Sequence, residues 1–487
     1  MPIDPSQYRT PLFDAMVSLA ESRKVSFHTP GHKSGKGIST RFSKYVGHKI
    51  FSIDLTTLDE VDSLQRPTGV IKEAQELAAR AYGCDRSFFL VNGTSVGNHA
   101  MVMAACGPGD RILMARNCHR SVLAGVILSG ASPQFFYPEF DPGLRMSLNV
   151  RSGTVREAVD AHPGVKVLLF TSPNYYGICA ETEKITSYAH ERGITVLVDE
   201  AHGPHLGFHP ELPPSALSCG ADMCVQSTHK IIGGMTQASM LHARDGRVDT
   251  AAVAGILKFI QTTSPSYILM ASLDLARMQM ATEGGKLLGQ ALTLSRWARA
   301  EINGIEGLHC LEMDEVMARG VGGLDETKLT INVSGLGRTG YEVSQMLNHE
   351  FGIQAEMADP YHVLLIVSIG DRREDIKLLV EAMVTIAQKG RAAGRAGVWD
   401  IGLPDFRNTS GLNPREAFLA PHDYLPLAGS EGRLSCDIVT VYPPGIPILV
   451  PGEVITRDVT DYLKTVVGLG GTVDGLTDDG RVGVVSK

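Results

Sequence analysis

The chain has 487 residues, of which 43% are hydrophobic and 20% are charged, which is typical of a globular protein with two or three domains. Its formal net charge of −8 argues against a nucleic-acid-binding surface. The chain does not open with a basic segment and an apolar run, and its charge-free stretches 87–109 and 121–138 are interrupted by Gly, Asn, His or Pro. We therefore expect neither a signal peptide nor a membrane span.

Residues 1–50 are expected to form an N-terminal arm with an amphipathic helix at 12–22. From about residue 70 to 245, short apolar strands alternate with helices. The expected strands are 87–91, 111–115, 165–170, 195–198, 223–226 and 239–242, and the helices include 96–105, 120–128 and 182–192. This alternation predicts an α/β fold with a mostly parallel sheet covered on both faces.

A long helical connection is expected at 266–303, and a βαββα unit follows it. The strands of this unit are expected at 328–333, 353–358 and 362–368, and its helices at 340–350 and 373–387. Residues 390–397 have the composition of a linker. We therefore divide the chain into an arm (1–50), a large domain (51–310), a small α+β domain (311–390) and a linker with a C-terminal α+β domain (391–487).

Two predicted strand ends carry polar residues with complementary chemistry. Asp199 follows the strand 195–198, and Lys230 closes the run Ser227-Thr228-His229-Lys230 after the strand 223–226. In a parallel sheet, ligands bind at the carboxyl ends of the strands. An amine for a Schiff base and a carboxylate for a ring nitrogen together suit pyridoxal phosphate. A surface lysine and a capping carboxylate are the structural alternatives.

Two further segments fit the same cofactor. Thr94 and Ser95 lie in a Gly-containing turn before an apolar helix, where hydroxyl and N–H groups bind phosphate or simply cap the helix. His119 follows another strand end, where it either stacks on a cofactor ring or caps a helix.

A histidine-rich segment supports a rival hypothesis, a zinc hydrolase. His202, His205 and His209 follow Asp199 with close spacing. The segment is rich in Gly and Pro and has no HExxH motif, so we favour no metal site.

Several motifs in order resemble the Orn/Lys/Arg decarboxylases. They are Asp-Glu-Ala-His at 199–202, Ser-Thr-His-Lys at 227–230, HTPGHKSG at 28–35, TTSPSY at 262–267 and YPPGIP with PGE at 442–447 and 451–453. The resemblance runs from about residue 10 to residue 460. It implies a pyridoxal-phosphate enzyme of the aspartate-aminotransferase-like fold (fold type I), most similar to the short bacterial biosynthetic arginine decarboxylases. It includes no counterpart of the N-terminal wing domain of longer members, so we do not expect their decameric rings.

The resemblance also implies roles for individual residues. Lys230 would carry the cofactor as a Schiff base, Asp199 would pair with the ring nitrogen, and His119 would stack on the ring. The remaining contacts would be Thr94, Ser95, Ser227 and His229 at the phosphate, Ser264 at the phosphate across a dimer interface, and Ala201 and His202 beside the ring. The active site would thus be shared between subunits of a homodimer or a higher homo-oligomer.

The implied reaction is decarboxylation of a basic amino acid. We predict L-arginine as substrate, giving agmatine for polyamine synthesis, with lysine or ornithine as the alternatives. His229 or Lys230 would return a proton to the α-carbon. An aminotransferase of the same fold, with Arg372 or Arg373 clamping a carboxylate, and a catalytically dead regulator remain open.

Acidic side chains are the candidates for reading the substrate's cation. Asp54 and Asp59 lie in an acidic segment that also holds Glu60 and Asp62, and Glu453 lies near the C-terminus. A solvated acidic loop is the structural alternative. The eight cysteines are scattered without a C-x-x-C motif, which predicts reduced thiols and a cytoplasmic enzyme.

Overall fold

The computed structural model describes residues 3–22, 24–392, 401, 404–405, 411–442 and 445–486. It divides into two compact units, one formed by Met1–Ala105 with Thr195–Leu288 and the other by Cys106–Ile194 with Gly289–Lys487. Most of the expected linker at 390–397, and Pro443 and Pro444 of the YPPGIP motif, lie outside the described residues. The four-part division of the chain stays a prediction.

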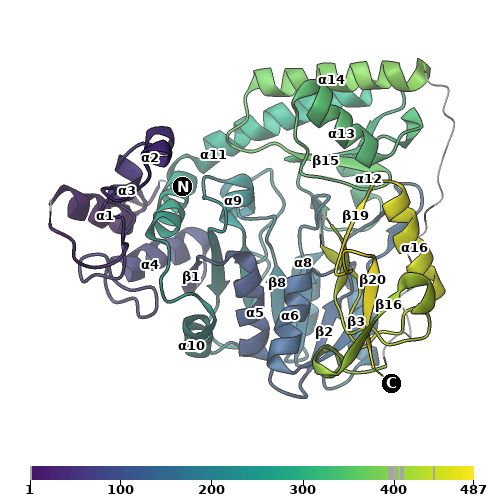
Figure 1. Cartoon of the computed structure of the whole chain (residues 1–487), viewed down its shortest axis with the longest axis horizontal. Coiled ribbons are helices and arrows are strands. Elements are labelled where there is room, and N and C mark those ends of the chain that lie inside the picture. Colours follow the sequence, from purple (N-terminus) through teal and green to yellow (C-terminus); the bar gives the residue numbers. More distant parts are fainter. Residues whose placement is uncertain are drawn as a thin grey trace. The chain divides into compact units, whose positions relative to one another are not determined.

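The first unit is built on strands in the order β1-β10-β9-β8, of which β1 and β8 are labelled in Figure 1. These strands are β1 (Arg86–Leu90), β8 (Thr195–Asp199), β9 (Met223–Gln226) and β10 (Ser239–Ala243). The helices of this unit are α1 (Pro11–Glu21), α2 (Thr40–Val46), α3 (Lys49–Ser52), α4 (Val70–Tyr82), α5 (Gly93–Ala105), α9 (Thr228–Ile231), α10 (Thr250–Ile260) and the first part of α11 (Tyr267–Asn303). Strands β9 and β10 are buried along their whole length, as expected for strands covered on both faces.

Strand β10 is the exception to the mostly parallel arrangement that the sequence predicts. Strands β8 and β9 are parallel, whereas β10 is antiparallel to both β9 and β1. A parallel crossover needs a connection with a full helix. The segment between β9 and β10 holds only the four-residue helix α9, so the chain reverses direction.

Helix α5 lies very close to the sheet of its unit, against β9 and β10 (Figure 1). A Cβ atom at Gly97 would lie 2.4 Å from Cγ2 of Val225 and 2.8 Å from Cδ1 of Leu90. Only glycine permits this approach, which positions the start of α5 beside the end of β9.

The second unit contains a parallel set of strands in the order β6-β2-β3. These are β2 (Arg111–Ala115), β3 (Ser132–Phe136) and β6 (Val167–Thr171), with helices α6 (Arg120–Ser129), α7 (Ser152–Ala161) and α8 (Thr182–His190). Two pairs of two-residue strands and one short helix complete this part, namely β4 (Phe140–Asp141) with β5 (Met146–Ser147), β7 (Ile178–Cys179) with β12 (Gly323–Leu324), and α12 (Met313–Met317).

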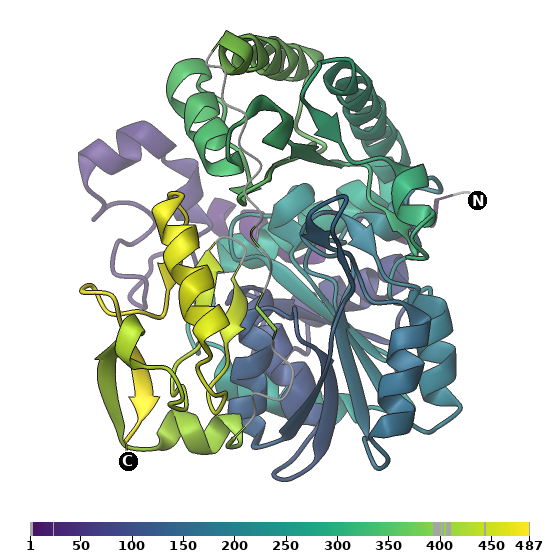
Figure 2. The same cartoon turned by 90° about the vertical axis from the view of Figure 1, so that its right-hand side faces the viewer.

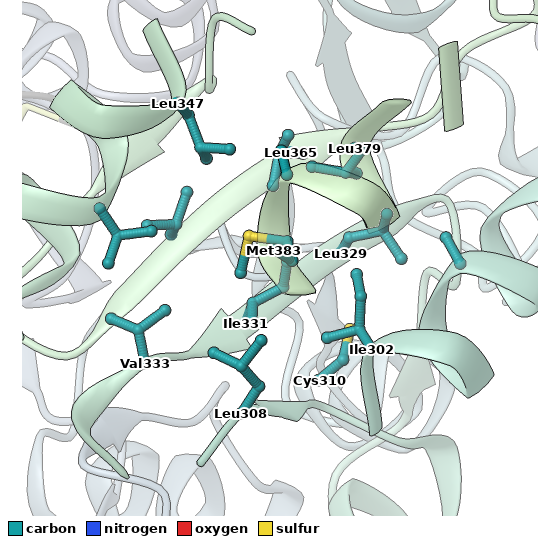
Figure 3. Packing of buried hydrophobic residues seen from close by; sticks show 14 of the residues in the cluster. Ile302, Leu308, Cys310, Leu329, Ile331, Val333, Leu347, Leu365, Leu379 and Met383 are labelled. Carbon is teal, nitrogen blue, oxygen red and sulfur yellow. The ribbon is translucent and has the colours of Figure 1, made fainter. Parts of the chain in front are cut away.

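An antiparallel sheet of order β11-β13-β15-β14 forms a separate layer of the second unit. Its strands are β11 (His309–Cys310), β13 (Lys328–Asn332), β14 (Met357–Ala358) and β15 (His362–Ile366), and its helices are α13 (Gly340–Phe351) and α14 (Arg373–Ala392). The expected βαββα order is therefore present, with β11 added at one edge. Figure 3 shows its core, in which Ile331, Leu365 and Met383 pack together with Cys310.

The C-terminal part of the second unit has two small sheets and one long helix (yellow in Figure 2). The strands are β16 (His422–Pro426) with β20 (Arg481–Val485), and β17 (Val439–Tyr442) with β18 (Ile446–Leu449) and β19 (Thr472–Asp474). The helices are α15 (Pro414–Leu419) and α16 (Arg457–Gly468). Val459 and Leu463 of α16 share one apolar core with Val439 of β17 and Val482 of β20. Of the helices described, none has both the length and the apolar composition needed to cross a bilayer.

Candidate active site

Asp199 and Lys230 lie at neighbouring strand ends in the first unit. Asp199 is the last residue of β8 and pairs in register with Val225 of the parallel strand β9. Ser227 follows β9 as the N-cap of α9, and Lys230 lies within that helix. The acid and the lysine therefore belong to the carboxyl ends of adjacent parallel strands, as the sequence predicts.

The carboxylate of Asp199 is buried with only 2% of the residue exposed. Within the described part of the chain, both hydrogen bonds that reach it come from neutral donors, Nδ2 of Asn98 at 2.9 Å and the backbone N–H of Ala201 at 3.1 Å. A buried carboxylate without a cation is costly, so this position suits a cationic ligand group. Sequence reasoning missed Asn98, although an amide inside the apolar helix 96–105 was a usable signal.

Lys230 contacts one of the residues expected beside the ring. Its Nζ lies 2.7 Å from Nε2 of His202, which accepts the hydrogen bond because an ammonium has only donors. His202 is 2% exposed and Ala201 is 8% exposed. Ala201, His202 and Lys230 thus lie at the carboxyl ends of β8 and β9.

The expected phosphate-binding residues also come together in this unit. The hydroxyls of Thr94 and Ser227 lie 3.1 Å apart, and Ser95 follows Thr94 in the first turn of α5. Helix α5 begins at Gly93, whose φ of +73° disfavours other residues. Hydroxyls at the start of a 13-residue helix offer donors to an anion.

His229 is fixed by a hydrogen bond to the backbone. Its Nδ1 donates to the carbonyl oxygen of Ala238 at 3.0 Å. This bond sets the tautomer and assigns any proton exchange with a ligand to Nε2.

His119 belongs to the second unit, where it is the N-cap residue of α6. Its Nδ1 accepts from the backbone N–H of Ser121 at 3.2 Å. The capping role weighed in the sequence is therefore present, and stacking on a cofactor stays a prediction.

The acidic segment proposed to read a substrate cation is split among different contacts. Asp54 pairs with Nε2 of His32 at 3.0 Å, Asp59 is exposed, and Glu60 pairs with Lys24. The role of Asp54 and Asp59 toward a substrate cation stays a prediction.

Asp62, the last acid of that segment, stabilises the start of helix α4. Its carboxylate accepts from the backbone N–H groups of Thr68 at 3.1 Å and Gly69 at 2.7 Å. Burial acts to raise the pKa of Asp62, but backbone N–H groups including those of Ser63, Thr68 and Gly69 outweigh it, so the pKa is lowered. Its contacts make Asp62 a structural residue.

Glu453 is engaged in an ion pair inside the second unit. Nε and Nη2 of Arg116 donate to its two oxygens at 3.1 and 2.8 Å, and the backbone N–H of Val450 donates to Oε2 at 2.9 Å. Both charged residues are 3% exposed. The sequence did not reveal Arg116 as the partner, because the two residues are 337 positions apart.

Three other predicted positions are exposed. Ser264 lies at the surface of the first unit, and its backbone N–H donates to Oγ1 of Thr262 at 3.2 Å. Arg372 and Arg373 are exposed at the start of α14, and the guanidinium of Arg373 lies 5.1 Å from the ring centroid of Trp297. Nothing in these contacts assigns the arginines to a carboxylate.

The described residues contain no group of three or more His, Cys, Asp or Glu side chains arranged to hold a metal ion. His209 uses Nδ1 to accept from the backbone N–H of Glu211 at 3.2 Å.

Comparison with known proteins decides the family. Residues 10–375 match the model of the Orn/Lys/Arg decarboxylase major domain, and residues 412–481 match that of the C-terminal domain. The chain belongs to the Orn/Lys/Arg decarboxylase family. This decarboxylase is 41% identical to the arginine decarboxylase of Bacillus anthracis over 97% of the chain and 96% of that relative. It is 42% identical to the arginine decarboxylase of Halalkalibacterium halodurans, with the same coverage of 97% and 96%.

Solved structures agree on the fold of this decarboxylase. The crystal structure of the Francisella novicida lysine decarboxylase LdcF aligns with a TM-score of 0.83 and 22% identity, covering 99% of this chain and 82% of that one. The predicted aspartate-aminotransferase-like architecture is thereby confirmed.

Proposed function

We propose that this family member is a pyridoxal-phosphate-dependent decarboxylase that converts L-arginine into agmatine and CO₂. The main support for this proposal is the 41–42% identity, over 97% of the chain, to relatives named as arginine decarboxylases. The solved structures that are named lysine decarboxylases are only 22–24% identical. Lysine and ornithine are the competing substrates.

The residues at the strand ends fit pyridoxal phosphate. Asp199 offers a buried carboxylate whose described donors are neutral, and Lys230 offers an amine that is held by His202. Thr94 and Ser227 offer adjacent hydroxyls at the start of α5 and α9. We propose that Lys230 binds the aldehyde, that Asp199 faces the ring nitrogen and that the hydroxyls hold the phosphate, together with Ser95.

When bound, the cofactor supplies an electron sink for the electron pair that remains after CO₂ leaves. Asp199 keeps a proton on the ring nitrogen, because the ionised carboxylate favours a cation beside it. Lys230 and Nε2 of His229 are the candidates that return a proton to the α-carbon. The roles of His119 at the ring and of Asp54 and Asp59 at the substrate's cation stay predictions from the sequence.

We further propose a homodimer in which Ser264 of one copy reaches the phosphate bound by its partner. The exposure of Ser264 leaves it available for such a contact. Phe27 and Tyr45 in the N-terminal arm are 92% and 91% exposed, and burying such aromatic side chains against a second copy is favourable. None of the eight cysteines, all of which the structure describes, forms a disulfide, which supports a location in the reducing cytoplasm.

The test compares CO₂ release from arginine, lysine and ornithine by the purified protein. We expect the highest kcat/KM for arginine, a yellow sample, and retention of the cofactor on Lys230 after borohydride reduction. The variant Lys230→Ala is expected to release no CO₂, whereas the surface control Lys258→Ala is expected to behave as wild type. Amino transfer to a keto acid without CO₂ release would establish an aminotransferase instead. A colourless protein would refute the proposal that it binds pyridoxal phosphate.

A further inference from the structure

A buried side-chain contact joins the two strand ends and has no part in the proposed reaction. Glu200 directly follows Asp199, and Gln226 directly precedes Ser227. Nε2 of Gln226 donates to Oε2 of Glu200 at 2.7 Å, and the backbone N–H of Ala216 donates to Oε1 at 2.6 Å. Glu200 and Gln226 are each 1% exposed. The contact therefore links Glu200, next to Asp199, to the last residue of β9, the strand that precedes Lys230.

The hydrogen bonds continue across the sheet to β1. Nε2 of His242 donates to Oε1 of Gln226 at 3.2 Å, and the hydroxyl of Ser87 donates to Nδ1 of His242 at 2.7 Å. The ring of His242 stacks on that of Tyr82 with centroids 4.4 Å apart. Burial lowers the pKa of His242 to about 3, so the ring is neutral and each nitrogen has one defined role.

A negative charge on Glu200 is costly in this position. Burial raises the pKa of Glu200 to about 8, although Gln226, Ala216 and Cys224 donate toward it. Glu200 interacts electrostatically with Cys224 on β9 and Tyr82 on α4. Cys84 before β1, Arg244 after β10 and Arg277 on α11 act on those two groups, and His242 on β10 stacks on Tyr82. Burial raises the pKa of both thiols and of the Tyr82 phenol, so these groups are neutral near pH 7. The guanidinium of Arg244 donates to the carbonyl oxygen of Leu217 at 2.7 Å.

We propose that Glu200 is a positioning residue, which holds the strand end of Asp199 in register with the strand end of Lys230 through Gln226. The inference deepens the proposed function and rests on it. Loss of the Glu200 proton would place a second negative charge one residue from Asp199. Such a charge favours protonated groups nearby, so the pH dependence of the bound cofactor's visible absorbance should include a step that belongs to Glu200.

Three variants separate positioning from general stability. Glu200→Ala removes the contact, Glu200→Gln keeps a hydrogen-bonding group but cannot ionise, and Asp222→Ala is the matched control. Asp222 is also buried, at 4% exposed, and its Oδ2 accepts from the backbone N–H of Val196 at 2.8 Å at the opposite end of the same two strands. The control therefore breaks an equivalent buried contact away from the proposed site.

We expect Glu200→Ala to lower kcat about ten- to a hundredfold with a smaller change in KM, and to weaken the visible circular dichroism of the cofactor. Glu200→Gln should restore most of both but lose the spectral step near pH 8. Asp222→Ala should lower the melting temperature while the circular dichroism and the spectral step stay as in wild type. Equal spectral effects of Glu200→Ala and Asp222→Ala, or no effect of Glu200→Ala, would overturn the proposal.

A measurement without cofactor keeps this inference separate from the proposed function. In the apoprotein, amide hydrogen exchange at 227–230 should accelerate in Glu200→Ala and not in Asp222→Ala. If wild type fails to bind the cofactor, the proposed function is refuted, while this exchange experiment still decides whether Glu200 holds the strand end. Unchanged exchange in Glu200→Ala would refute the positioning role.

Discussion

Removing the carboxylate of Glu453 is expected to destabilise the C-terminal region without changing the choice of substrate. In Glu453→Gln, the guanidinium of Arg116 would remain buried and lose its charged partner. Removing one member of a buried pair typically costs about 3–5 kcal/mol. Arg116 keeps the carbonyl oxygens of Pro447 at 2.6 Å and Ile448 at 3.3 Å, so we expect the lower end, about 3 kcal/mol.

The assay is denaturant unfolding of wild type, Glu453→Gln, Arg116→Met and the double variant. The double variant should be more stable than the sum of the single effects predicts, with a coupling of about 2 kcal/mol, because no charge is left unpaired. The ratio of kcat/KM for arginine and lysine should stay within about twofold in Glu453→Gln. If Glu453→Gln unfolds at the same denaturant concentration as wild type but changes the arginine-to-lysine ratio of kcat/KM, the stabilising role is refuted and Glu453 is a substrate contact.

Three further variants test other features. Gly97→Ala should destabilise the first unit by about 1–3 kcal/mol, measured by thermal melting, because its Cβ would lie 2.4 Å from Cγ2 of Val225. A melting temperature equal to that of wild type would show that α5 can shift away from the sheet without cost. Asp62→Asn should remove a stabilisation that wild type has at neutral pH and loses as pH falls through the lowered pKa of Asp62, so the two melting curves should converge in acid. The raised pKa of Glu200 means that wild type loses stability relative to Glu200→Gln as pH rises from about 4.5 to about 8, with no further loss above that range; a pH-independent difference in melting temperature would contradict this sign.

Much of the fold could be predicted because local periodicity carries it. The strands at 111–115 and 223–226 and the long helix at 266–303 follow apolar runs and turn residues, and the structure has them within a residue or two. The sequence predicts a mostly parallel sheet but not which strand runs antiparallel, because strand direction depends on the length of the connection rather than on the strand's own composition.

Some residues of the candidate site could likewise be predicted from the sequence, and others could not. Asp199 and Lys230 could be predicted to share a sheet edge, since strand ends are visible in sequence. Asn98 and the Arg116–Glu453 pair could not, because such contacts depend on which distant segments the fold brings together. Acidic residues are informative only once their partners are known.

The buried thiols make this protein suitable for site-resolved unfolding measurements. Seven of its eight cysteines are buried, and Cys310 lies in the core shown in Figure 3. Burial raises the pKa of Cys106 to about 12 and that of Cys310 and Cys436 to about 11. Since alkylating reagents need the thiolate, each thiol reacts only after its surroundings open. The labelling rates of Cys310 and Cys436 would therefore time the opening of the small antiparallel sheet and of the C-terminal sheets separately, without any added probe.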